Sequence, residues 1–243
     1  MNITTIKTSI FKVNQDLLAF LTANLPTLND GDIVVVTSKI VALAEGRIVS
    51  KNSGVTKEEI IKQESSFVLP TKYVRLTVKD GAVMASAGID ESNAQDCFIL
   101  LPADSFLVAN QIRHYLLQQR QLKRLGVIIT DSRSLPLRAG IAGVALGYAG
   151  FGGLRDYRGC PDIFGRPLHF SRVNLADSLA AAAVLCMGEA DERQPLAVIS
   201  EAPVIYCEQV DRHELWIDPN EDIYAPLFKN YPAASFDKNK PLN

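Results

Sequence analysis

Apolar residues along the chain recur with periods that alternate between those of helices and those of strands. Leucines between positions 17 and 25 fall on one helical face, Asn14 is placed to cap that helix, and Pro26 follows its end. Residues 33–36 then form a continuous β-branched run, which predicts a strand buried on both faces. A helix followed closely by a buried strand is typical of an α/β protein.

The same patterns continue through the rest of the chain. They predict further helices at 57–65, 104–124 and 174–187, the last capped by Asn174 and stopped by Gly188. They predict further strands at 73–78, 97–101, 126–130 and 196–200. We therefore expect an α/β (α+β) fold with mixed sheets and flanking helices.

Glycine is concentrated between positions 140 and 165, where we expect tight turns and little regular structure. We treat 1–237 as a single unit, with two intertwined subdomains as the open alternative. Residues 238–243 have the composition of a flexible C-terminal tail.

Composition narrows the class of protein. Of the 243 residues, 47% are hydrophobic and 21% charged, which is the balance of a globular protein with a real core. The formal net charge of -2, without a broad basic field, argues against nucleic acid as a partner. No segment reaches the length and apolarity of a membrane span, and the four cysteines show no close pairing. We expect a cytoplasmic protein with reduced thiols.

Several common catalytic motifs are absent. The sequence contains no G-x-x-x-x-G-K-[ST] loop, no strand-linked G-x-G-x-x-G and no G-x-S-x-G elbow. The three histidines lack metal-ligand spacing. The familiar phosphate-binding loops and serine hydrolases are therefore excluded.

Three acidic residues stand at the ends of apolar elements: Asp90, Asp131 and Glu189. Each also has an ordinary structural interpretation, because Asp90 can form an Asx turn, Asp131 can cap the next segment and Glu189 can be a solvated loop residue. Glu189 fits that interpretation least well, since a carboxylate just past a helix C-terminus faces the negative end of the helix dipole.

If the three carboxylates converge, each pair at ~4 Å repels by about 4 kcal/mol at an effective dielectric near 20. A divalent cation would relieve that repulsion. Carboxylates, together with the Ser132 hydroxyl and the Asn93 amide, offer the oxygen ligands that suit Mg²⁺ or Mn²⁺. The sequence thus predicts a metal site whose remaining ligands include substrate phosphates.

Several segments in order resemble the coenzyme F420-0:gamma-glutamyl ligase family. The early ones are 30–36, 44–47 and 87–93. The later ones are Asp131, Arg138, 145–147, 156–159, Asp162, 165–168 and 176–189. The resemblance covers about residues 10 to 205.

This resemblance implies a GTP- and Mg²⁺- or Mn²⁺-dependent ligase that adds L-glutamate to a carboxylate of the F420 precursor through an acyl-phosphate, as an intertwined homodimer. Its partners would be an amino-acid donor, a small carboxylate acceptor and a second copy of the chain. The implied metal ligands are Asp90, Asp131, Ser132 and Glu189, of which Asp131 is also catalytic. Ser38, Asn93 and Glu189 would contact the nucleotide.

Two positions depart from the family pattern. Leu43 stands where the resemblance implies a lysine near the phosphates. Lys39, four residues upstream, either takes over that contact or is a solvated residue at the end of the strand. Residues 131–136 read Asp-Ser-Arg-Ser-Leu-Pro, which keeps the metal-binding pair but changes the following loop. Arg138 and Arg158 are expected to stabilise charge or to pair with structural carboxylates. A ligase for another acceptor and a non-catalytic nucleotide- or metal-binding relative both remain open.

Overall fold

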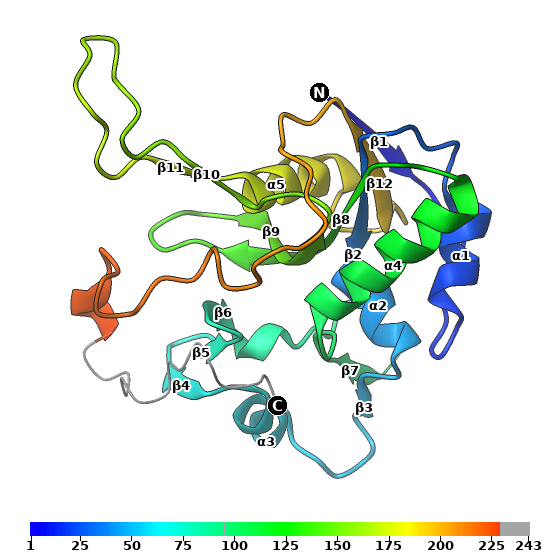
Figure 1. Ribbon diagram of the computed structural model, residues 1–243. Coiled ribbons are helices and arrows are strands. Elements are labelled where there is room, and N and C mark those ends of the chain that lie inside the picture. Colours follow the sequence, from blue (N-terminus) through cyan, green and yellow to red (C-terminus); the bar gives the residue numbers. More distant parts are fainter. Residues whose placement is uncertain (95, 229–243) are drawn as a thin grey trace.

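A five-stranded sheet forms the centre of the protein, and helices cover both of its faces (Figure 1). The computed structural model describes residues 1–94 and 96–228, so the expected tail at 238–243 lies outside the described residues. The elements are β1 (Asn2–Ile6), α1 (Leu17–Asn24), β2 (Asp32–Thr37), α2 (Ser38–Ala44), β3 (Ile48–Ser50), α3 (Lys57–Glu64), β4 (Phe67–Pro70), β5 (Arg75–Lys79), β6 (Ala82–Ala85), η1 (Ser86–Gly88), β7 (Cys97–Ile99), α4 (Ser105–Arg120), β8 (Leu125–Ser134), β9 (Ile141–Ala149), β10 (Leu154–Asp156), β11 (Arg172–Asn174), α5 (Leu175–Met187), β12 (Leu196–Ser200) and η2 (Ala225–Phe228).

The central sheet is mixed, as the sequence predicts. Its strand order is β1-β12-β2-β8-β9. Strands β2 and β8 run parallel, and the other neighbours are antiparallel. The parallel pair brings the carboxyl ends of β2 and β8 to the same edge of the sheet.

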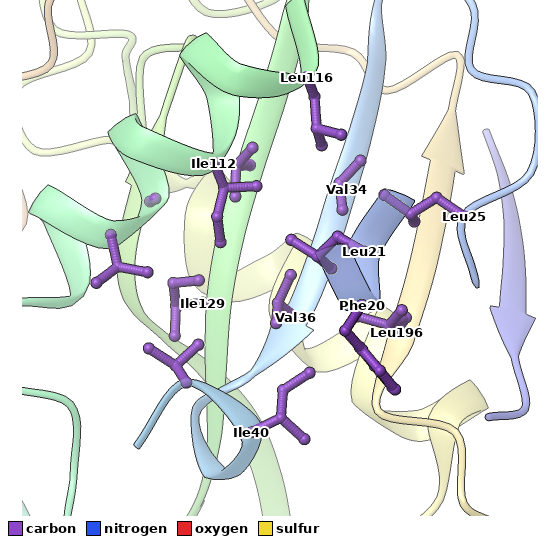
Figure 2. Packing of buried hydrophobic residues seen from close by; sticks show 14 of the residues in the cluster. Phe20, Leu21, Leu25, Val34, Val36, Ile40, Ile112, Leu116, Ile129 and Leu196 are labelled. Atoms are coloured by element: carbon purple, nitrogen blue, oxygen red, sulfur yellow. The ribbon is translucent and has the colours of Figure 1, made fainter. Parts of the chain in front are cut away.

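Strand β2 is buried on both faces because its side chains alternate between two hydrophobic clusters. Val34 and Val36 pack with residues of α1, α2 and α4, a cluster that Figure 2 shows at close range. Ile33 and Val35 pack on the opposite face, where α5 covers the sheet. The predicted two-sided burial of this strand is confirmed.

A smaller region lies beside the central sheet, below it in Figure 1. It contains α3, the three-stranded sheet β4-β5-β6 and the pair β3-β7. Its own cluster is built around Ile60, Ile61 and Phe98. Because η1 follows β6 directly, this region carries the segment that leads to Asp90.

The expectation of little regular structure between 140 and 165 is wrong for its first half. Residues 141–149 form β9, which pairs along β8. Gly143 and Gly147 permit this strand to approach two helices, since a Cβ at these positions would come within 2.6 Å of Ala180 O and 2.5 Å of Ser105 C. These glycines therefore serve close packing of strand and helix rather than turns.

Some element boundaries also differ from the prediction. Asp16, not Asn14, caps α1 by accepting from Ala19 N, because Asn14 adopts a left-handed φ of 58° where the chain turns. Helix α4 ends at Arg120, since Gln121 is left-handed as well. The sequence did not predict α2, which begins directly at the end of β2.

None of the helices within residues 1–94 and 96–228 combines the length and apolar character needed to cross a membrane. The four cysteines are all free thiols, as their spacing predicts.

The packing of α4 on the central sheet generates a stability prediction. Leu116 is fully buried on this helix, whereas Leu107 is 53% exposed. We expect Leu116→Ala to lower the free energy of unfolding by about 2–5 kcal/mol, because it removes buried apolar contacts and leaves a cavity. The matched variant Leu107→Ala should change it by no more than about 0.5 kcal/mol. Equal losses for both variants in denaturant unfolding would contradict this account of the core.

Candidate active site

A cavity of about 1650 Å³ lies at the edge of the central sheet where β2 and β8 end. Thr37 at the end of β2 is in register with Thr130 on β8. The two residues after Thr37 therefore lie close to the two after Thr130. The predicted metal and nucleotide residues all line this cavity: Ser38, Lys39, Asp90, Asn93, Asp131, Ser132 and Glu189.

An irregularity in β8 precedes the first of these acids. The register between β8 and β9 shifts between Ile129 and Thr130, immediately before Asp131. Such bulges change the direction in which a strand presents its side chains. Beyond the bulge Asp131 lines the cavity, as expected for a predicted site residue. The strand does not end just before it, as the sequence predicted, but continues to Ser134.

Glu189 reaches the cavity from the end of α5. Gly188 terminates that helix with a φ of 84°, a conformation that favours glycine. Ser132 Oγ donates a hydrogen bond to Glu189 Oε1, which joins β8 to the segment after α5. Two of the predicted metal ligands are therefore in direct contact, and Glu189 is exposed but not merely solvated.

Asp90 forms both a local turn and an ion pair. Its Oδ1 accepts from Ser92 N at 2.7 Å, which is the Asx turn considered for this residue. Its Oδ2 lies 2.6 Å from Lys39 Nζ. The same ammonium donates to the carbonyl and the hydroxyl oxygens of Ser92, each at 3.1 Å. The ammonium group of Lys39 therefore already lies against the Asp90 carboxylate.

The acids influence one another electrostatically. Burial raises the pKa of Asp131 to about 6; Arg133 opposes that rise, and the negative charges of Asp90 and Glu189 add to it. Burial also acts to raise the pKa of Asp90, but hydrogen bonds from Lys39 and Ser92 outweigh it and lower that pKa. Burial therefore dominates the pKa of Asp131, whereas the contacts with Lys39 and Ser92 dominate that of Asp90.

The convergence expected from the sequence is incomplete. Asp90, Asp131 and Glu189 face one cavity, yet within the described part of the chain no three Asp, Glu, His or Cys side chains are gathered as a ready metal site. The ion pair between Lys39 and Asp90 accounts for part of this, because an ammonium already satisfies that carboxylate.

The other predicted residues occupy different places. Asn93 has a left-handed φ of 55° and donates from Nδ2 to Ala190 O at 3.5 Å across the cavity. Arg138 is exposed in the turn between β8 and β9 and does not line the cavity. Arg158 pairs with Asp156 at 2.6 Å, so it has the structural carboxylate partner considered for it.

Sequence reasoning missed two segments that form a wall of the cavity. These are residues 7–13, before α1, and residues 190–195, after α5. Thr8 N donates to Arg193 O at 2.9 Å and holds the two segments together. Neither segment contains a motif, so no signal in the sequence pointed to them.

The sequence of this chain matches known proteins over most of its length. A model of the family described as F420-0:Gamma-glutamyl ligase matches residues 5–201. A Methanococcus maripaludis (strain C6) protein named Coenzyme F420:L-glutamate ligase is 35% identical over 225 residues, covering 85% of this chain and 90% of its own. Proteins with the same name are 38% identical in Methanothermobacter thermautotrophicus, over 72% of this chain and 77% of theirs, and 32% identical in Archaeoglobus fulgidus, over 88% and 92%.

The matched region contains the cavity's carboxylates and their supporting strands. By sequence match and by the extent of both chains covered, this chain belongs to the F420-0:gamma-glutamyl ligase family.

Proposed function

We propose that this protein is a cytoplasmic ligase that joins L-glutamate to a carboxylate of the F420 precursor and consumes GTP. The observation that carries the proposal is the cavity at the end of β2 and β8, where three carboxylates from separate segments face residues suited to phosphate contact. The names of the relatives support the choice of acceptor and donor.

The residues present fit a divalent cation. All the donors that would hold it are oxygens, supplied by Asp90, Asp131, Ser132 and Glu189, which is the set that Mg²⁺ and Mn²⁺ prefer. Burial is the main cause of the raised pKa of Asp131, and the negative charges of Asp90 and Glu189 add to it. Bound there, the ion would neutralise charge on the nucleotide phosphates.

In the proposed reaction an oxygen of the acceptor carboxylate attacks the γ-phosphorus, and GDP leaves with the bond electrons. The amine of L-glutamate then attacks the acyl carbon, loses a proton and displaces phosphate. Ser38 and Asn93 line the wall on which the nucleotide would lie. Lys39, released from Asp90, would place its ammonium against the phosphates, and Ser132 would hold Glu189 in position.

An arm that extends from the body of the protein offers an apolar surface for contact with a second copy of the chain. The arm runs from β10 to β11 and projects away from the central sheet (Figure 1). It carries Ile163, Phe164 and Phe170, which are 92%, 76% and 91% exposed. Large apolar side chains on a projecting segment favour contact with a partner, and we propose a homodimer joined through this arm.

Leu43 favours a second candidate. It lines the cavity where the family has a lysine, so the positive charge available to the phosphates is smaller than in the family pattern. A ligase for another carboxylate, or a nucleotide-binding relative without catalysis, would be compatible with that change.

The direct test is to incubate the purified protein with F420-0, L-glutamate, GTP and Mn²⁺ and to follow products by mass spectrometry. We expect one added glutamyl group with one GDP and one phosphate released per bond. Asp131→Asn should abolish product formation, whereas the surface variant Asp211→Asn should retain it. If the protein binds nucleotide but forms no product with F420-0 or any other carboxylate, the ligase proposal is wrong and the protein is a non-catalytic nucleotide-binding relative. GTP cleavage stimulated only by another carboxylate would change the acceptor.

Metal binding should be visible as a change in stability. We expect Mn²⁺ at a hundredfold excess over its dissociation constant to stabilise the native state by about 2.7 kcal/mol. Asp131→Asn should lose this response. Because the pKa of Asp131 is raised to about 6, the native carboxyl must release its proton to bind metal, so the response should weaken as the pH falls from 7.5 to 5. Thermal melting measures the response of wild type, its loss in Asp131→Asn and its dependence on pH. A wild-type melting temperature that does not change across millimolar Mn²⁺ would defeat the metal proposal.

Lys39 should contribute to nucleotide affinity. We expect Lys39→Ala to weaken GTP binding about ten- to a hundredfold in calorimetric titration at fixed metal and salt, since a charged hydrogen bond is lost. The control Lys62→Ala removes an exposed lysine on α3 and should leave the affinity unchanged. Leu43→Lys should strengthen binding by restoring the missing charge. If Lys39→Ala binds GTP as tightly as wild type, Lys39 is only the partner of Asp90.

A further inference from the structure

A second, smaller cavity lies on the far side of Leu101 from the large one. Its volume is about 150 Å³, and Leu101 lines both cavities. Arg133, Asp80 and Asp177 contribute charged groups to its wall, and Trp216 and Tyr148 contribute rings. A cavity of this size can hold a small molecule but not a nucleoside triphosphate.

Arg133 is the unusual group in this wall. Its Nε is buried and has no hydrogen-bond partner, and none of the described carboxylates forms an ion pair with its guanidinium. A guanidinium carries five N–H donors, so leaving one largely buried without an acceptor is unfavourable. Burial accordingly lowers the pKa of Arg133, although the charges of Asp131, Asp177 and Asp80 act to raise it.

The acids near Arg133 are already engaged elsewhere. Asp177 accepts from Ala145 N at 2.8 Å and from Asn174 Nδ2 at 2.6 Å. Asp80 lies 3.9 Å from Lys79. Arg212, the other arginine in this wall, pairs with Asp104 at 3.2 Å. The charges of Asp131, Asp177 and Asp80 act on Arg133, but among the described residues no carboxylate forms an ion pair with its guanidinium, and its Nε has no acceptor.

The position of Arg133 connects this cavity to the proposed chemistry. Asp131 and Arg133 are two residues apart on β8, beyond the bulge, and extended strands place such residues on one face about 7 Å apart. A small amino acid extending past Leu101 would bring its two ends toward Arg133 and toward the large cavity. Carboxylates match the planar fork of a guanidinium, and an ammonium suits the acidic surroundings.

We propose that the small cavity binds the amino-acid donor, with one donor carboxylate paired to Arg133 and the amine directed toward the cavity that contains Asp131. This inference rests on the proposed ligase function for the identity of the donor. It assigns to Arg133 the selection of an acidic or zwitterionic amino acid, which no motif in the sequence indicates.

The test compares Arg133→Gln and Arg133→Lys with the surface control Arg75→Gln, whose guanidinium pairs with Glu58 away from both cavities. We expect Arg133→Gln to raise the KM for L-glutamate about ten- to a hundredfold, with the KM for GTP unchanged. Arg133→Lys should recover part of the loss. The ligand-free melting temperature of Arg133→Gln should stay the same or rise, because an unpaired buried charge is removed.

Several outcomes would overturn the assignment. An unchanged KM for L-glutamate in Arg133→Gln, or equal increases for L-glutamate and GTP, would show that Arg133 does not bind the donor. A dimer in wild type that becomes a monomer in Arg133→Gln, by sedimentation, would assign the guanidinium to a carboxylate of the second copy. A clear drop in melting temperature for both Arg133 variants, with unchanged KM, would make its role one of packing.

Calorimetric titration of L-glutamate, with and without a non-hydrolysable GTP analogue, separates this inference from the proposed function. Binding that Arg133→Gln weakens, in a protein that forms no amide product, would retain the donor site and reject the ligase. Product formation with a KM for L-glutamate that Arg133→Gln leaves unchanged would retain the ligase and reject the donor site. Neither binding nor product in wild type would reject both.

Discussion

The parallel pairing of β2 with β8 is the constraint on which the site depends. Both strands are buried on two faces, and their register sets Thr37 beside Thr130. Because the strands run in the same direction, whatever follows them must emerge at one edge of the sheet. The cavity at that edge receives Ser38 and Lys39 from the start of α2, directly after β2, and Asp131 and Ser132 from β8. A shift of one residue in this pairing would turn every side chain of a strand to the other face.

Charge balance then decides how the side chains of the cavity are arranged. Carboxylates facing a common space cannot all remain ionised without compensation. Lys39 compensates Asp90 directly, and Ser132 donates to Glu189, while Asp131 meets the problem by a raised pKa. Lys39 therefore occupies the position against Asp90 that the proposed metal ion would require.

Two glycines of β9 allow the central sheet to pack closely against its helices. Gly143 and Gly147 sit where β9 meets α5 and α4, with no room for a Cβ. Their effect reaches the site, because β9 pairs with β8 through the bulge that precedes Asp131. Glycines that resemble turn residues in the sequence therefore support the strand that pairs with β8 around Asp131.

The sequence by itself determined the elements whose signal is local. Strand β2, helix α5 with its Asn174 cap, and the position of Glu189 just past that helix could all be predicted from apolar runs and capping residues. The predicted strand end just before Asp131 was wrong, because β8 continues to Ser134. Family membership could also be inferred, since it rests on the order of short segments. These features depend on neighbours a few residues away, so periodicity and spacing are sufficient to find them.

Only the tertiary structure decided the features that depend on distant contacts. Strand β9 forms by pairing with β8, and its glycines leave room for two helices to pack closely against it. Lys39 pairs with Asp90 because the fold brings together two segments that are far apart in the sequence. The buried, unpartnered Nε of Arg133 likewise had no signal in a segment that the sequence predicted to be a loop. Whether a charged side chain is buried, paired or unpaired is set by residues far away in the chain, and no local pattern encodes it.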